Sequence, residues 1–408
     1  MEQFKRLKLS GWRQFDNVDI SFEGQTTVLT GGNGCGKTTI LNVLSRHFGW
    51  NMNFSATPFV GKKKRKKIYT DLKRIFESEE APSQAETIGN LSYSTGGECL
   101  LQVPQNSSTN PQYSLGYQNQ KQVIGLHIPS HRPAITFQNV DSLPVNPKTI
   151  QQHYQEFQQL LLSTYGSANV RNPGLVLKQS LISLALFGYG NEAVQGNEEY
   201  KELFLSFQEI LKIVLPKTLG FEKLEVRMPD VVLVTRTGEF PLSSMSGGVN
   251  SLFGIAWQIH MYGADKESCT VILDEPENHL HPSMQRSLLP DLAKAFPKYK
   301  FIIATHSPFI VTSNPDANVY GLIYNDSHRI VSEHLGKADL AGSPDKVLRE
   351  ILDVPTTLPI WVEDKISEIL QKYEGSPDTE DKITKMFDEL KSMGLNDSLS
   401  LFNYKSGE

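Results

Sequence analysis

Gly31-Gly32-Asn33-Gly34-Cys35-Gly36-Lys37-Thr38 is the stretch of sequence that decides the fold. It matches the pattern G-x-x-x-x-G-K-[ST], follows a predicted strand at residues 26–30 and precedes an apolar stretch that predicts a helix. Glycines let successive backbone N–H groups wrap around phosphate oxygens, and a helix N-terminus adds positive potential. We therefore expect these eight residues, together with Thr39, to bind the phosphates of ATP.

Two residues of this loop have specific expected roles. Lys37 should neutralise the β- and γ-phosphate oxygens, and the Thr38 hydroxyl should ligate Mg²⁺. A chance glycine turn is the alternative, but the strand before the loop and the helix after it are the context that a phosphate loop requires.

A second stretch supplies acids. Residues 271–273 are a short apolar run that ends in Asp274 and Glu275. Such a run favours a strand buried in a parallel sheet, so both carboxylates should lie at its carboxyl end. Asp274 is then placed to hold Mg²⁺, and Glu275 to position and activate the attacking water. A strand end capped by ordinary acids is the alternative.

Two weaker motifs become candidate site residues because the phosphate loop and the acidic strand end are also present. Ser246-Gly247-Gly248 opens a predicted helix 28 residues before Asp274 and forms another candidate anion cradle. His306 follows the apolar run at 301–304 and is placed to hydrogen-bond the γ-phosphate. Without the phosphate loop, a Ser-Gly-Gly turn and a lone histidine would be interpreted as structural features.

Composition and charge narrow the class of protein. The 408 residues are 39% hydrophobic and 21% charged, as in ordinary globular proteins, and the net charge is −5. Any attraction to nucleic acid must therefore be local. Three scattered cysteines fit a reducing compartment. We find neither a signal-peptide pattern nor an apolar run of membrane-helix length, so we expect a cytoplasmic protein without a membrane partner.

The periodicity of apolar residues predicts an α/β fold in four parts. Residues 1–145 should form a first lobe with the phosphate loop and an antiparallel sheet beside a mixed-sheet nucleotide-binding core. Residues 146–221 predict a helical insertion. Residues 222–343 should form a second lobe with the remaining motifs, and residues 344–408 a helical C-terminal region. In the second lobe, the apolar runs at 231–234, 271–273 and 301–304 are all expected as buried strands of a parallel sheet.

The order of the motifs resembles that of ATP-binding-cassette (ABC) ATPases. The form Asp274-Glu275-Pro276-Glu277-Asn278-His279-Leu280-His281-Pro282 is similar, more narrowly, to the overcoming-lysogenization-defect (OLD)-like group (AAA_15/AAA_21). That group includes ATPase subunits of phage-defence modules such as PARIS AriA and Septu PtuA. Leu9-Ser10-Gly11-Trp12-Arg13-Gln14-Phe15 and Ser130-His131-Arg132 resemble the same group. The motif resemblance covers about residues 1–60 and 225–312.

The resemblance implies a shared ATP site. ABC-type heads usually sandwich two ATP molecules, so we expect a homo-oligomer built from ATP-sandwich dimers. Ser246, Gly247 and Gly248 of one chain would then reach the nucleotide of the other, and Mg-dependent hydrolysis would yield ADP and phosphate. Arg13 and Arg132 are each interpreted either as a nucleotide contact or as a salt-bridge residue. Gln138 is the candidate for the glutamine loop.

The resemblance also implies a role in the cell. We expect a sensor or scaffold subunit of a bacterial anti-phage defence system that controls a separate effector chain, expected to be a nuclease. The sequence after His306 shows no clustered acids typical of a nuclease site. The alternatives are a DNA-repair or chromosome ATPase of RecF or Rad50 type, although the insertion is too short for Rad50 arms, and the energising subunit of a transporter.

One basic segment stands out in this acidic chain. It holds six consecutive cations, Lys62, Lys63, Lys64, Arg65, Lys66 and Lys67. Like charges repel one another, which predicts an exposed loop. The loop is either solvated surface or the landing site of an acidic trigger, such as nucleic acid or a phage protein that mimics DNA.

Overall fold

The computed structural model contains two compact units, residues 1–347 with 351–353 and residues 348–350 with 354–408. It describes residues 2–60, 67–72, 84–105, 109–132, 135–142, 147–164, 172–337, 344–350, 352, 354, 359–373, 384–385, 388–389 and 391–392. Within these ranges no helix has the length and apolar character needed to cross a membrane.

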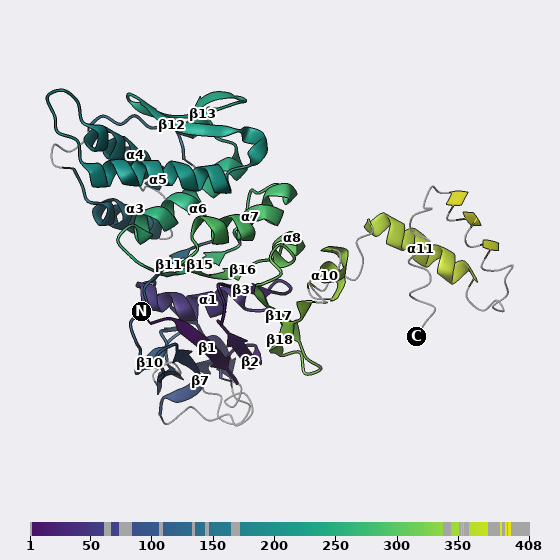
Figure 1. Cartoon of the computed structure of the whole chain (residues 1–408). Coiled ribbons are helices and arrows are strands. Elements are labelled where there is room, and N and C mark those ends of the chain that lie inside the picture. The colour runs from purple at the N-terminus through teal and green to yellow at the C-terminus, as the bar shows by residue number, and fades with distance from the viewer. Residues whose placement is uncertain are drawn as a thin grey trace. The chain divides into compact units, whose positions relative to one another are not determined.

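One large sheet organises the first unit (Figure 1). Its eleven strands follow the order β10 (Gly116–Gln118), β8 (Glu98–Val103), β7 (Glu86–Tyr93), β1 (Phe4–Leu9), β2 (Phe15–Ser21), β18 (Ile330–Leu335), β17 (Asn318–Tyr324), β3 (Thr26–Thr30), β16 (Lys300–Ala304), β15 (Thr270–Asp274) and β11 (Gly125–Ile128). Neighbours from β10 to β2 are antiparallel, and those from β17 to β11 are parallel. The expected fold class, a mixed-sheet core beside an antiparallel lobe, is confirmed.

Burial explains why these segments are strands. All five residues of β3 and of β15 are buried, as a strand covered on both faces requires. Helix α1 (Lys37–Ser45) buries Ile40, Leu41, Val43 and Leu44. Figure 1 shows α1 on one side of the parallel strands, with α6 (Gly247–Gly263) and α7 (Pro282–Ala295) on the other. Because β3, β16 and β15 are parallel neighbours, their carboxyl ends lie at the same edge of the sheet.

The insertion is helical, as the periodicity predicts. Its helices are α3 (Ile150–Thr164), α4 (Pro173–Tyr189) and α5 (Glu198–Val214). One face of α3 is apolar and buried, and it consists of Ile150, Tyr154, Phe157 and Leu161. Phe157 lies against Trp257 of α6, with ring centroids 4.8 Å apart, so the insertion packs directly on the helix that Ser246 begins.

One strand prediction was wrong. Residues 231–234 do not join the parallel sheet but lie in β13 (Asp230–Thr235), the middle of a separate antiparallel sheet with β12 (Phe221–Arg227) and β14 (Gly238–Pro241). Two-residue turns at 228–229 and 236–237 connect the three strands. The run is apolar because a middle strand that also contacts α4 is buried, and burial alone does not distinguish parallel from antiparallel pairing.

Smaller elements complete the described residues. They are η1 (Arg46–Phe48), β4 (Phe54–Ser55), β5 (Thr57–Val60), β6 (Lys67–Thr70), β9 (Gln112–Tyr113), η3 (Lys217–Leu219), η4 (Leu242–Ser244), α8 (Pro308–Val311), α10 (Pro344–Glu350) and α11 (Ile360–Tyr373). The basic segment lies outside the described residues except for Lys67, which begins β6. The four-part domain division stays a prediction.

Candidate functional site

The phosphate loop joins β3 to α1 and depends on glycine at three positions. Gly31, Gly34 and Gly36 have φ values of 142°, 80° and 91°, a region that favours glycine. A Cβ added at Gly31 would lie 2.4 Å from the Leu322 carbonyl oxygen, and one added at Gly36 would lie 2.5 Å from Cζ of Phe15. The loop is thus shaped by its own glycines and by neighbouring backbone and ring atoms.

Lys37 is held inside this loop. Its ammonium group donates to the carbonyl oxygens of Gly31 (2.8 Å) and Gly32 (3.1 Å), and only 5% of the residue is exposed. Nδ1 of His306 lies 3.3 Å away, and Sγ of Cys35 lies 3.5 Å away. The cation is therefore positioned at the centre of the loop, where phosphate oxygens would be expected.

Thr38 and Asp274 meet across the parallel strands. The Thr38 hydroxyl lies 3.0 Å and 3.2 Å from the two carboxylate oxygens of Asp274. Asp274 is 4% exposed, and burial raises its pKa to about 6; the hydroxyl of Thr38 lowers it, and the nearby charge of Glu275 raises it. A buried carboxylate beside a hydroxyl is a donor set of hard oxygens that suits Mg²⁺, so these two residues fit the ion.

Glu275 has an uncommon backbone conformation. Its φ is +43°, and its N–H donates to the carbonyl oxygen of Ala304 at 2.9 Å. One carboxylate oxygen lies 3.5 Å from Nε2 of His306, and the other accepts from the side-chain amide of Asn278 at 3.2 Å. Such a conformation is costly for a residue with a side chain, and it directs this carboxylate toward the histidine.

His306 and Glu277 connect the ends of β15 and β16. One oxygen of Glu277 accepts from the Thr305 hydroxyl (2.8 Å) and from the His306 N–H (2.7 Å). Burial, followed by the charge of Lys37, lowers the pKa of His306, so the imidazole is neutral at pH 7. Lys37, Glu275 and His306, which lie far apart in sequence, are thus brought to one place.

Three further residues belong to this arrangement although sequence reasoning gave them no role in it. Glu277 and Asn278 lie inside the motif that begins at Asp274, which was the available signal. Gln14 donates from its side-chain amide to the carbonyl oxygen of Gly34 at 3.2 Å. The opening segment therefore supports the phosphate loop through Gln14 and Phe15.

Other candidate residues lie elsewhere. Ser246, at the start of α6, is exposed, and a Cβ at Gly247 would lie 3.5 Å from Cβ of His279. Arg13 lies with Nε 3.9 Å from a carboxylate oxygen of Asp71, which agrees with the salt-bridge interpretation. Their nucleotide contacts stay predictions.

The remaining candidates complete the loop and its surroundings. Asn33 and Gly34 are exposed, and Thr39 is half-buried. Gln138 accepts from the ammonium of Lys178 through its backbone carbonyl at 2.9 Å, so the structure ties its backbone to α4. Whether its side chain acts as the glutamine loop also stays a prediction.

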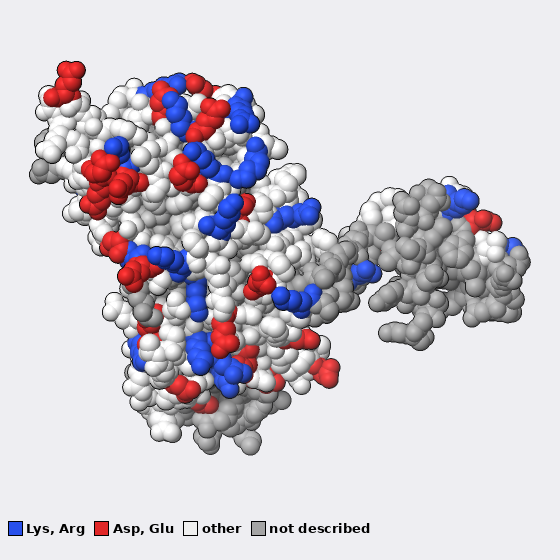
Figure 2. Space-filling model, viewed as in Figure 1, with Lys and Arg blue, Asp and Glu red and all other residues white. Residues whose placement is uncertain are grey.

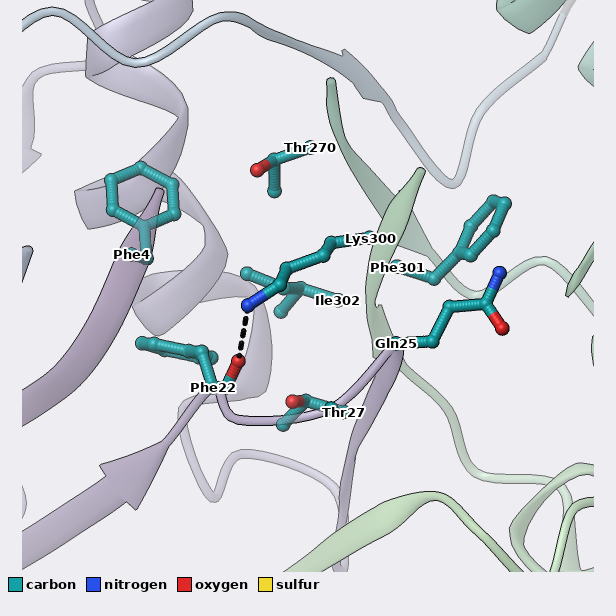
Figure 3. Close-up of a pocket in the computed structure, with 9 residues that line it drawn as sticks. Phe4, Phe22, Gln25, Thr27, Thr270, Lys300, Phe301 and Ile302 are labelled. Carbon is teal, nitrogen blue, oxygen red and sulfur yellow. Dashed lines mark hydrogen bonds between the residues drawn. The ribbon is translucent and has the colours of Figure 1, made fainter. Parts of the chain in front are cut away.

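A pocket lies at the opposite end of the same strands (Figure 3). Thr270 and Lys300 begin β15 and β16 there, and the Lys300 ammonium donates to the Phe22 carbonyl oxygen at 3.2 Å. Burial lowers the pKa of Lys300. Because open α/β sheets bind ligands at the carboxyl ends of their strands, we interpret this pocket as a packing feature.

Comparisons with known proteins agree with the site. The AAA_23 family model, described as an AAA domain, matches residues 6–213, just over half of the chain. The AAA_21 model, an AAA domain whose description adds "AbiEii toxin, Type IV TA system", matches residues 152–312. The first match contains the phosphate loop, and the second contains Asp274, Glu275 and His306.

Curated relatives point in the same direction at low identity. The chain is 31% identical over 105 residues to the Retron Ec83 probable ATPase of Escherichia coli, covering 26% of this chain and 18% of that protein. It is 26% identical over 148 residues to the Retron Vc95 probable ATPase of Vibrio cholerae, covering 33% and 28%. The Septu protein PtuA of Bacillus thuringiensis is 19% identical over 402 residues, covering 93% and 90%. The matches thus span less than a third of the retron ATPases but nearly all of PtuA.

SMC head domains are among the similar solved structures. The SMC head domain from Thermotoga maritima gives a TM-score of 0.38 at 14% identity, covering 82% of this chain and 98% of that domain. This score is too low to carry a functional comparison. The expected resemblance to AAA_21 proteins and to Septu PtuA is confirmed, and by its match to more than half of the sequence the chain belongs to the AAA_23 family of AAA domains.

Proposed function

We propose that this chain binds ATP with Mg²⁺ at the loop 31–38 and hydrolyses it with Asp274 and Glu275. The observation that carries the proposal is the contact of the Thr38 hydroxyl with both Asp274 oxygens, 3.0 Å and 3.2 Å away. It joins the phosphate loop to the acidic strand end through residues 236 positions apart. The convergence of Lys37, Glu275 and His306 supports the same function.

Each residue has a role that follows from its chemistry. Lys37 would exchange its two carbonyl partners for phosphate oxygens, and Thr38 and Asp274 would hold the ion. When bound, Mg²⁺ neutralises charge on the phosphates. Glu275 orients the attacking water and accepts its proton, while the neutral His306 lies beside both Lys37 and Glu275, where it can donate to the γ-phosphate.

We propose further that the chain is the ATPase subunit of a bacterial anti-phage defence system. The similarity to PtuA along nearly the whole chain supports this role. In this role it would form ATP-sandwich dimers through Ser246 and control a separate effector chain, expected to be a nuclease. Among the described residues on the face shown in Figure 2, acidic and basic side chains are interspersed, and no broad basic surface is visible among them.

The first experiment uses Glu275→Gln, which keeps the shape of the side chain but removes the proton acceptor. We expect ATP binding, followed with a fluorescent analogue, to change little, and kcat to fall by about 100-fold or more. The exposed Glu267→Gln is the matched control and should hydrolyse ATP at the wild-type rate. Equal kcat values for the two variants would contradict the role of Glu275.

The second experiment tests the cellular role. Glu275→Gln and Lys37→Ala are purified from the native host in MgATP, and their masses and bound molecules are compared. We expect Glu275→Gln alone to form a defined oligomer that carries a second protein in fixed ratio. A complex loaded with DNA and lacking a protein partner would refute the defence role and favour the repair alternative.

A further inference from the structure

Three consecutive carbonyl groups converge on one arginine beside the candidate catalytic acid. Nη1 of Arg132 donates to the Asp274 carbonyl oxygen at 3.2 Å, and Nη2 donates to those of Glu275 (3.1 Å) and Pro276 (3.4 Å). Nη1 also donates to the carbonyl oxygen of Pro129 at 3.0 Å. The guanidinium therefore joins the loop after β11 to the turn after β15, its parallel neighbour.

Three carbonyl groups that point to one side favour a cation near their oxygens. Successive carbonyls of a regular strand point to opposite sides, but the φ of +43° at Glu275 breaks the strand geometry and brings three of them to one side. Their negative ends then repel one another. The planar fork of a guanidinium matches several acceptors at once and makes charge-assisted hydrogen bonds, so it compensates for both the repulsion and the backbone strain.

The same loop is also linked to the carboxylate of Glu275 through Asn278. The side-chain amide of Asn278 lies 3.4 Å from the carbonyl oxygen of Ser130 and 3.2 Å from a carboxylate oxygen of Glu275. One contact thus orients the side chain, while the arginine holds its backbone. The loop after β11 thus reaches the side chain of Glu275 through Asn278, which contacts Ser130, and reaches its backbone through Arg132.

We propose that Arg132 is a positioning residue for ATP hydrolysis, which holds the turn 274–276 so that the Glu275 carboxylate faces the phosphate loop. This inference rests on the proposed function. It assigns Arg132 a role through the backbone of the acid and not through contact with the nucleotide. ATP binding should therefore survive the loss of the arginine, whereas the chemical step should not.

The test separates binding from chemistry. In Arg132→Met we expect the Kd for a fluorescent ATP analogue to stay within about 3-fold of wild type and kcat to fall about 10- to 100-fold, as is usual when a supporting residue of a site is lost. Arg132→Lys keeps the charge but not the fork and should also lose kcat. In Arg132→Ala, millimolar guanidinium ion should restore part of the lost rate, which a general packing defect would not allow.

Controls keep the outcomes distinct. Arg46→Met removes another half-buried arginine, stacked on the Tyr117 ring at the far end of α1, and should retain wild-type kcat. If Arg132→Met does not fold, Asn278→Ala tests the same loop and should lower kcat with little change in Kd. Wild-type kcat in the folded Arg132→Met and Arg132→Lys variants, or a large loss of ATP affinity, would overturn the inference. Failure of the wild-type chain to bind or hydrolyse ATP would instead overturn the proposed function.

Discussion

Substitution of Gly36 by alanine tests how the opening segment shapes the phosphate loop. Gly36 caps α1 with φ 91° and ψ 17°, and a methyl group added there would lie 2.5 Å from Cζ of Phe15 and 2.6 Å from Nε2 of Gln14. Phe15 is fully buried, so its ring has little room to move. Gly49 offers a matched comparison, because it has nearly the same conformation, φ 86° and ψ 5°, and nothing lies within 4 Å of its added methyl group.

The expected loss in the free energy of unfolding follows from the conformation and the neighbours of these two glycines. An alanine in the left-handed region costs about 1–2 kcal/mol, a penalty that Gly36→Ala and Gly49→Ala share. Overpacking against a fixed neighbour adds about 1–3 kcal/mol at Gly36 alone. We therefore expect Gly36→Ala to lower the free energy of unfolding by about 2–5 kcal/mol and Gly49→Ala by about 1–2 kcal/mol.

Urea unfolding followed by tryptophan fluorescence measures the difference, and a fluorescent ATP analogue reports on the loop. We expect Gly36→Ala to lose both stability and nucleotide affinity, and Gly49→Ala to keep its affinity. In the double variant Gly36→Ala/Phe15→Leu the smaller side chain should recover about 1–2 kcal/mol of the loss in a double-mutant cycle. Equal destabilisation by the two alanines, or no coupling with Phe15, would refute the steric reasoning.

Two further predictions concern acid sensitivity and the histidine of the site. Burial lowers the pKa values of His127 and His260 to about 4, below the ordinary value of about 6.5. Their stabilising contribution is therefore complete above pH 6.5 and is lost as the pH falls toward 4, by about 3 kcal/mol for each group. The melting temperature should thus be flat above pH 7 and decline below pH 6.5, less steeply in His127→Phe; a flat profile from pH 7 to pH 5 would contradict this. Glu277→Leu removes the acceptor that holds Thr305 and His306 and should lower kcat about 10-fold, whereas Glu277→Gln, which keeps an acceptor oxygen, should retain most activity. Equal rates in these two variants would argue against the anchoring role.

The sequence predicted the parts of the site whose conformation is local. A phosphate loop is recognisable because glycine spacing, lysine and the flanking strand and helix all lie within a short segment. Asp274 and Glu275 were predictable for the same reason, since an apolar run ending in acids marks a strand end. The proximity of Asp274 to Thr38 was implied only by the expectation that both residues hold the same Mg²⁺ ion.

The parts that depend on distant pairing could not be predicted. The apolar run at 231–234 does not indicate which sheet the strand joins, because buried antiparallel and buried parallel strands are equally apolar. The hydrogen bonds of Arg132 depend on the directions in which three backbone carbonyl groups point. The identities of the side chains do not indicate these directions. Arg13 shows the same limit, since an arginine beside an apolar segment does not reveal that Asp71 is its partner.

The position of β3 in the sheet has a consequence for how the protein is made. Its two neighbours are β16 and β17, which begin at residues 300 and 318, whereas the phosphate loop is complete by residue 38. At a synthesis rate of about 5–20 residues per second, the loop emerges roughly 15–60 s before the strands that support it. During that time β3 has neither of its two neighbouring strands. We therefore expect that nascent chains that end before β17 do not retain ATP. The phosphate loop is thus synthesised early, but the strands that complete the nucleotide site are synthesised only near the end of the first unit.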